Sequence, residues 1–124
     1  MGGAAAVARI KGDREPVLCG VCRRRAYGYG VAPAQSKPVM WLCDSPECWA
    51  LGQGVYTMPT AELDEFEKAA RDAAGERAGA YLDSIGKTDL AQLTGEEWRL
   101  FLHQVIVGFE DELRAIFRKS LAPF

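Results

Sequence analysis

Four cysteines are the residues of this 124-residue sequence whose spacing indicates chemistry most clearly. They form two close pairs, Cys19 with Cys22 and Cys43 with Cys48, and twenty residues separate the pairs. Such spacing is typical of a structural zinc site, in which four thiolates surround one Zn²⁺ tetrahedrally. A closed shell of four sulfurs leaves no coordination position for a substrate, so the pattern predicts a single Zn²⁺ with a structural role.

The elements that position these cysteines can be predicted from their flanks. Asp44 or Ser45 can cap a helix that has Pro46 at its first position, which places Cys48 in the first turn. Strands are predicted over residues 23–30 and 37–42. A cysteine turn, a β-hairpin and a ligand-bearing helix make a treble-clef arrangement. A zinc ribbon, whose second cysteine pair lies in another turn, is the alternative.

The start of the chain bears on the state of the cysteines. Residues 1–8 lack a basic beginning, and their apolar stretch is too short and too alanine-rich for a signal peptide. We therefore expect a cytoplasmic protein, in which a reducing environment disfavours disulfides. The longest apolar runs fall well short of the ~20 residues that a membrane helix needs, so no membrane partner is expected.

The charge differs between the two halves of the chain. Residues 1–59 carry seven basic and four acidic residues, a balance of +3, whereas residues 60–124 carry eight and thirteen, a balance of −5. This asymmetry predicts parts with different roles. We expect an α+β fold with a flexible tail over residues 1–15, a four-cysteine zinc lobe over residues 16–56 and a helical hairpin, packed on that lobe, over residues 57–124.

The first helix of the hairpin is predicted over residues 60–85. Apolar residues recur there at steps of three and four, and Gly86 suits the C-terminal stop. Gly75 and Gly79 lie four residues apart within it. We expect them either to allow close approach of another helix or to mark a kink between two shorter helices.

The second helix is predicted to start at a capping box of Thr94 and Glu97 and to run to Lys119. Its apolar stripe is wide enough to be buried on two sides, by the first helix and by the zinc lobe, a second copy of the chain or a foreign protein. The stripe consists of Trp98, Leu102, Val105, Phe109, Leu113 and Ile116 and is widened by Phe101, Ile106 and Phe117. The predicted protein-interface residues are Trp98, Phe101, Ile106 and Phe117.

An arginine run follows the first cysteine pair directly. Arg23, Arg24 and Arg25 could grip phosphates, and Tyr27 and Tyr29 could stack on bases. Alternatively, the arginines offset the −2 charge of a four-thiolate zinc shell, and the tyrosines, two apart on a strand, cover the cysteine turn or pack on Trp41.

No catalytic residue is predicted. The chain has one histidine, His103, on a polar helix face, and it carries no paired catalytic carboxylates, glycine-rich phosphate loop or nucleophile elbow. We therefore expect neither an enzyme nor a small-molecule substrate.

Two segments of the chain resemble a small domain-of-unknown-function family that occurs in phages and prophage-bearing bacterial genomes. The resemblance covers two segments. The first is residues 19–50, which contain the cysteines and the motif from Arg24 to Gly30, and the second is residues 81–113, which contain the motif from Ile85 to Trp98. It implies a zinc-finger-like start, a helical end and a phage or prophage origin, hence a bacterial host cell, but no activity.

The sequence therefore predicts a non-enzymatic zinc-binding interaction protein that binds a protein partner or itself. The alternative is a small zinc-finger protein that binds nucleic acid through its arginine run.

Overall fold

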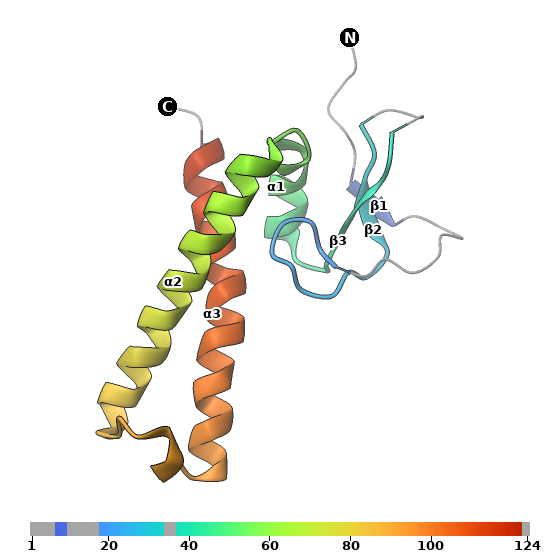
Figure 1. Cartoon of the computed structure of the whole chain (residues 1–124). Helices are drawn as coiled ribbons and strands as arrows, with labels where there is room; N and C mark the ends of the chain where they lie inside the picture. The colour runs from blue at the N-terminus through green and yellow to red at the C-terminus, as the bar shows by residue number, and fades with distance from the viewer. Residues whose placement is uncertain (1–6, 10–17, 34–36, 123–124) are drawn as a thin grey trace.

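In the part of the chain that the structure describes, three short strands precede three α-helices. The structure is a computed structural model that describes residues 7–9, 18–33 and 37–122. Its elements are β1 (Val7–Arg9), β2 (Tyr29–Val31), β3 (Met40–Leu42), α1 (Pro46–Tyr56), α2 (Thr60–Ile85), a short 3₁₀ helix (Leu90–Gln92) and α3 (Gly95–Leu121). The sheet and α1 lie to one side of a long hairpin formed by α2 and α3 (Figure 1).

The sheet is antiparallel in the order β1-β2-β3. Strand β3 falls within its predicted segment and is shorter, whereas β2 overlaps the predicted residues 23–30 only at their end and extends one residue beyond them. Val31 and Leu42 turn their side chains into the core. Strand β1 corrects one prediction. Residues 7–9 belong to the predicted flexible tail, yet they pair with β2, with Val7 opposite Val31. The rest of that tail lies outside the described residues.

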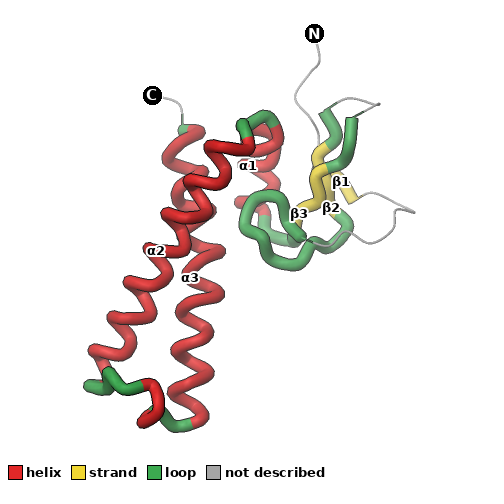
Figure 2. The backbone as a smooth tube through the Cα atoms, in the orientation of Figure 1, coloured by secondary structure: helices red, strands yellow, loops and turns green. Residues whose placement is uncertain are grey.

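Helix α1 begins where the sequence predicted. Ser45 occupies the N-cap position and Pro46 the first helical position, although the Ser45 side chain makes no capping hydrogen bond. Leu51 and Val55 are buried on the side of α1 that packs against the hairpin. The sheet, the cysteine loop and α1 together form the cysteine-bearing half of the chain. Because only residues 57–59 connect α1 to α2, this half is held close to the hairpin (Figure 2).

The end of α2 and the start of α3 are set by the predicted caps. Gly86 ends α2 in the left-handed conformation, with φ of 67°. At the start of α3, the Thr94 hydroxyl accepts a hydrogen bond from the Glu97 amide, and the Glu97 carboxylate accepts one from the Thr94 amide. This reciprocal pair is the predicted capping box.

The close contact between α2 and α3 does not involve the predicted glycines. Helix α2 is continuous, and a Cβ at Gly75 or Gly79 would meet nothing within 4 Å. Instead, Gly108 of α3 packs on Ala74 of α2, where an added Cβ would lie 3.4 Å from the alanine backbone. Alanines at four-residue steps, buried at positions 70, 74 and 78, form the seam that lets the helices approach.

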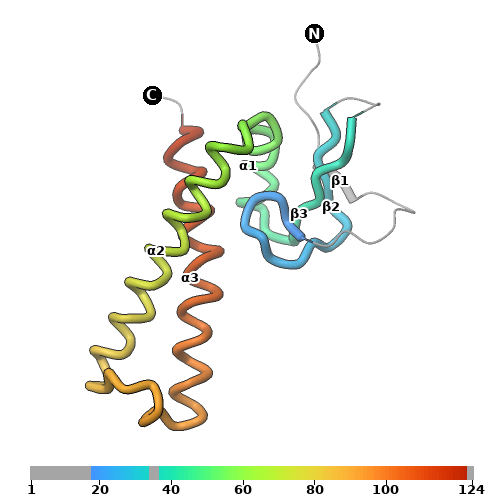
Figure 3. The backbone as a smooth tube through the Cα atoms, in the orientation of Figure 1, coloured from blue at the N-terminus to red at the C-terminus, as the bar shows by residue number. Residues whose placement is uncertain are grey.

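The core is continuous from the cysteine-bearing half into the hairpin. Phe117 and Leu113 of α3 are buried in one cluster with the four cysteines and with Leu51 and Val55 of α1. The half of the hairpin that holds the start of α3 extends past the sheet and α1 (Figure 3). None of the described helices combines the length and the hydropathy that crossing a bilayer requires.

Glu97 should give the hairpin a specific pH dependence. The Lys87 ammonium, at 2.6 Å, and the Thr94 amide, at 2.9 Å, lower the pKa of the Glu97 carboxyl below the ordinary 4.5. A carboxyl whose pKa is lower in the folded state stabilises it above the unfolded pKa, and this contribution is lost as the pH falls through the folded pKa. We therefore expect the thermal midpoint to fall more steeply from about pH 5 to about pH 3 in wild type than in Glu97→Gln. Melting curves that shift equally in both proteins would contradict this.

Candidate metal centre

The first cysteine pair lies in a tight loop between Leu18 and Arg25, which form an isolated antiparallel bridge. The Cys19 amide donates to the Arg24 carbonyl at 2.6 Å, and the Arg23 amide donates to the Cys19 carbonyl at 3.0 Å. These bonds turn both cysteines to the same side. Cys19 and Cys22 are both fully buried.

The backbone of this loop constrains two positions, Gly20 by a close approach to β3 and Arg23 by its conformation. Gly20 donates its amide to the Trp41 carbonyl at 2.8 Å, and a Cβ at Gly20 would collide with the side chain of Met40. Any other residue at position 20 would force the Met40 side chain to move, so glycine suits the close approach of this loop to β3. Arg23 has φ of 67°, a left-handed conformation that disfavours residues with a Cβ.

The second cysteine pair lies where β3 passes into α1. Cys43 follows the last residue of β3, and Cys48 lies in the first turn of α1. The Trp49 indole donates to the Cys43 carbonyl at 2.8 Å, which fixes this junction. Both cysteines are fully buried.

The four sulfur atoms form one cluster. All lie within 4.8 Å of one another, and Cys22 Sγ and Cys43 Sγ are 3.8 Å apart. A tetrahedral metal with sulfurs at 2.3 Å requires an S–S separation of about 3.8 Å. No disulfide joins any of the four, and all are shielded from solvent. The donor set, its burial and its spacing therefore fit a tetrahedral metal ion.

Backbone amides point at two of the sulfurs. The Val21 amide donates to Cys19 Sγ and the Ser45 amide to Cys43 Sγ, each at 3.4 Å. Hydrogen bonds of this kind stabilise thiolate over thiol. In each pair, the first cysteine thus receives a bond from the amide two residues later.

The thiols strongly influence one another's ionisation. Hydrogen bonds from Cys22 and Cys48 lower the pKa of the Cys19 thiol far below its usual range. Donation to Cys19 in turn raises the pKa of Cys22 to about 12, and it raises that of Cys48 as well. Four buried thiolates cannot form together without a compensating cation, and a divalent metal supplies that charge.

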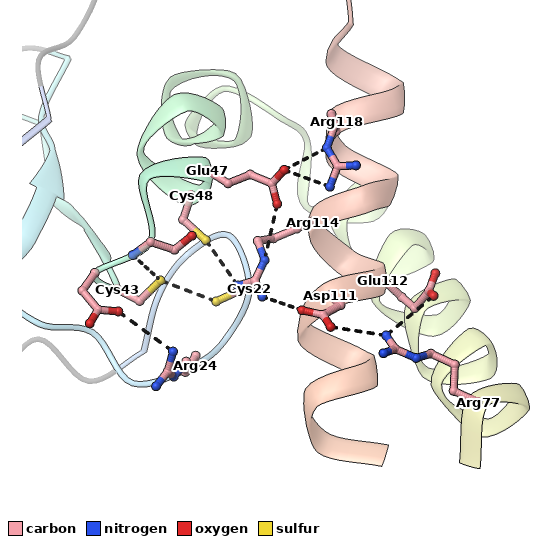
Figure 4. Close-up of polar contacts among 12 residues, drawn as sticks. Cys22, Arg24, Cys43, Glu47, Cys48, Arg77, Asp111, Glu112, Arg114 and Arg118 are labelled. Atoms are coloured by element: carbon pink, nitrogen blue, oxygen red, sulfur yellow. Dashed lines mark hydrogen bonds and ion pairs between the residues drawn. The ribbon is translucent and has the colours of Figure 1, made fainter. Parts of the chain in front are cut away.

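A charged network, which the sequence analysis missed, connects the cysteine cluster to the hairpin (Figure 4). Arg114 of α3 donates to Cys48 Sγ at 3.7 Å and to Asp111 at 2.7 Å, and it lies 3.6 Å from Glu47. Arg118 also binds Glu47, at 2.9 Å. The available clue was that Arg114 and Arg118 lie four residues apart and so share one face of α3.

The five predicted nucleic-acid residues differ in their surroundings. Arg23 lies 4.0 Å from Glu67, and Arg24 lies 3.9 Å from Asp44, while Arg25 packs over the Tyr27 ring at 5.9 Å. Tyr27 is exposed. Tyr29 instead packs on Trp49, with ring centroids 4.7 Å apart, and belongs to the border of the core. The aromatic partner of Tyr29 is thus Trp49, a residue that the sequence did not indicate.

The four predicted interface residues divide into two groups. Trp98 and Phe101 stack at 5.8 Å near the start of α3, and Ile106 is 58% exposed on the same helix. Phe117 is 1% exposed and packs edge-on against Phe66 of α2. The expectation for Phe117 is therefore corrected, because its stripe runs into the chain's own core at the end of α3 that faces α1.

The second half of the chain matches a known protein family. A model described as a family of unknown function (DUF6511) matches residues 60–124, just over half of the chain. The chain belongs to this family. The DUF6511 segment begins at the first residue of α2 and includes Arg114, whereas all four cysteines precede it. The resemblance stated for residues 19–50 thus lies outside the matched segment. No curated protein and no solved structure matches the chain.

Proposed function

We propose that the chain binds one structural Zn²⁺ through Cys19, Cys22, Cys43 and Cys48 and acts as a non-enzymatic interaction protein. The cluster of four buried sulfurs within 4.8 Å carries this proposal. Tetrahedral four-sulfur sites suit zinc or iron–sulfur chemistry, and structural zinc with four thiolates has no open position for a substrate. Four free thiols also fit a reducing cytoplasm.

The surrounding backbone supports a treble clef over a ribbon. The first pair lies in a turn, the antiparallel strands β2 and β3 follow, and Cys48 comes from the first turn of α1. A ribbon would place its second pair in another turn rather than on a helix. We also propose a phage or prophage origin, which rests on the sequence resemblance alone.

The partner-binding part of the proposal rests on exposed apolar residues in the first half of α3. Trp98, Val105 and Ile106 are 43%, 37% and 58% exposed there, although they continue the stripe that is buried at Leu113. A cavity of about 310 Å³ adjoins this stripe between the cysteine loop, α2 and α3, and its walls include Val105 and Ile106. An apolar side chain of a protein partner would fit this cavity.

Ile106→Glu should abolish partner binding without unfolding the chain. A carboxylate at this exposed position would have to be desolvated in any apolar interface, whereas it stays hydrated in the free protein. Leu100→Glu is the matched control, because Leu100 is 43% exposed on α3 but lies off the stripe. Sedimentation velocity would detect self-association, and affinity purification with mass spectrometry would identify a foreign partner.

We expect an identified protein, or a second copy of the chain, to be retained by wild type and Leu100→Glu and lost by Ile106→Glu. This part of the proposal would be overturned if the chain is a monomer and if no protein that it retains requires Ile106 for binding.

The alternative function, nucleic-acid binding, is favoured by one observation: Arg23, Arg24, Arg25 and Tyr27 are all exposed, and Arg25 lies over the Tyr27 ring. The acidic neighbours of Arg23 and Arg24 weaken it. Arg23→Gly is an informative test, because glycine accepts the left-handed conformation at this position.

Because of these acidic neighbours, we expect fluorescence anisotropy to detect no salt-dependent binding of labelled DNA or RNA to wild type. Binding that weakens steeply with salt, and weakens further in Arg23→Gly, would instead support the alternative.

A further inference from the structure

Arg114 reaches the cysteine cluster from the opposite half of the chain. Its guanidinium donates to Cys48 Sγ across 66 residues of sequence, and only 15% of its side chain is exposed. Burial of this kind disfavours a charged group unless negative charge lies nearby. An arginine guanidinium stays protonated in proteins, so Arg114 is a permanent cation that donates to Cys48 Sγ and to Asp111.

The N–H donor of Cys48 comes from a different source than the donors of Cys19 and Cys43. Cys19 and Cys43 each receive an amide from their own turn, whereas Cys48 receives a charged side chain from α3. Four thiolates around Zn²⁺ carry a net charge of −2, which is concentrated on the sulfurs. A charge-assisted bond from a buried guanidinium is therefore much stronger when the metal holds Cys48 as a thiolate than when Cys48 is a neutral thiol.

The guanidinium is held in place by carboxylates on both sides of the junction. Asp111, on α3 itself, accepts from Arg114 at 2.7 Å, and Glu47, next to Cys48 on α1, lies 3.6 Å away. Asp111 also lies 3.4 Å from Arg77 of α2. All three helices thus contribute to the position of one side chain (Figure 4).

We propose that Arg114 couples metal binding to the docking of the DUF6511 hairpin on the cysteine-bearing half. This inference rests on the zinc site proposed above. Arg114 acts as a positioning residue that stabilises Cys48 as a thiolate, so hairpin docking slows zinc release and zinc strengthens docking. The two effects are reciprocal because they express one coupling free energy.

Zinc release into an excess of a chromophoric chelator measures this coupling. Residues that support metal ligands from outside the coordination shell typically change metal affinity by about 10–100-fold, so we expect at least about tenfold faster release from Arg114→Gln. Arg118→Gln is the matched control. It lies on the same helix face and binds the same Glu47, but it is exposed, so we expect release within about twofold of wild type.

A spectroscopic readout separates this role from a merely structural one. In the cobalt-substituted protein, loss of an N–H donor raises the energy of the thiolate electrons. The sulfur-to-cobalt charge-transfer band of Arg114→Gln should therefore move to longer wavelength, and that of Arg118→Gln should not. Should Arg114→Gln fail to fold, Arg114→Lys, which keeps the charge but loses the planar fork, should still release zinc faster than Arg118→Gln.

Equal release rates and unshifted bands in the Arg114 variants would overturn the inference while leaving the zinc site intact. Absence of zinc from the wild-type protein would instead refute the proposed site itself, so the two failures are distinguishable.

Discussion

Removal of the metal from the purified protein should unfold the cysteine-bearing half and leave the α2–α3 hairpin helical. Each strand of the sheet has only three residues, and the four cysteines form a large part of the core beside them. So little apolar surface cannot stabilise this half alone. Structural zinc contributes about 10–16 kcal/mol of apparent binding free energy in small finger peptides, and this contribution would be lost.

The three tryptophans report on the two halves separately. Trp41 and Trp49 belong to the cysteine-bearing half, and Trp98 lies on α3. On chelation, we expect the indole NMR signals of Trp41 and Trp49 to move to unfolded positions while that of Trp98 stays. Cys43→Ser should give the same spectrum without chelator, and Ser45→Ala should remain as wild type, since the Ser45 hydroxyl makes no capping bond. Three unmoved signals would contradict the expectation.

Phe117→Ala should have the largest effect on stability of any substitution in the hairpin. Phe117 is 1% exposed, packs on Phe66 of α2 and is part of the cluster that contains Leu51 and Val55 of α1. Truncation of a fully buried phenylalanine leaves a cavity and costs about 3–5 kcal/mol. Urea denaturation followed by circular dichroism should show this loss in the free energy of unfolding.

Ile106→Ala is the natural comparison for Phe117→Ala. Ile106 belongs to the same apolar stripe of α3 but is 58% exposed, so its truncation should change the free energy of unfolding by less than about 1 kcal/mol. Equal effects of the two substitutions would mean that Phe117 does not lie in the core.

The local elements were predictable because each rests on a short-range pattern. The bounds of α2, the stop at Gly86 and the capping box of Thr94 and Glu97 agree with the structure. The four cysteines were also recognised as one cluster, since close pairs at this spacing favour convergence on a metal. In each case, the interacting groups lie within one turn of chain or belong to a recurrent motif.

The contacts between distant elements were not predictable in the same way. Gly75 and Gly79 have the spacing of a close helix contact, but α3 approaches α2 along Ala74 and Gly108 instead. The role of Phe117 in the core depends on where α1 lies. The Arg114 contact with Cys48 joins residues 66 apart, and no local pattern encodes such a pairing.

Metal analysis with X-ray absorption tests most directly whether the four cysteines hold one structural zinc ion. Protein purified without added metal should contain one zinc per chain, surrounded by four sulfurs at about 2.3 Å. A zinc content well below one per chain, or a shell with fewer than four sulfurs, would contradict the account.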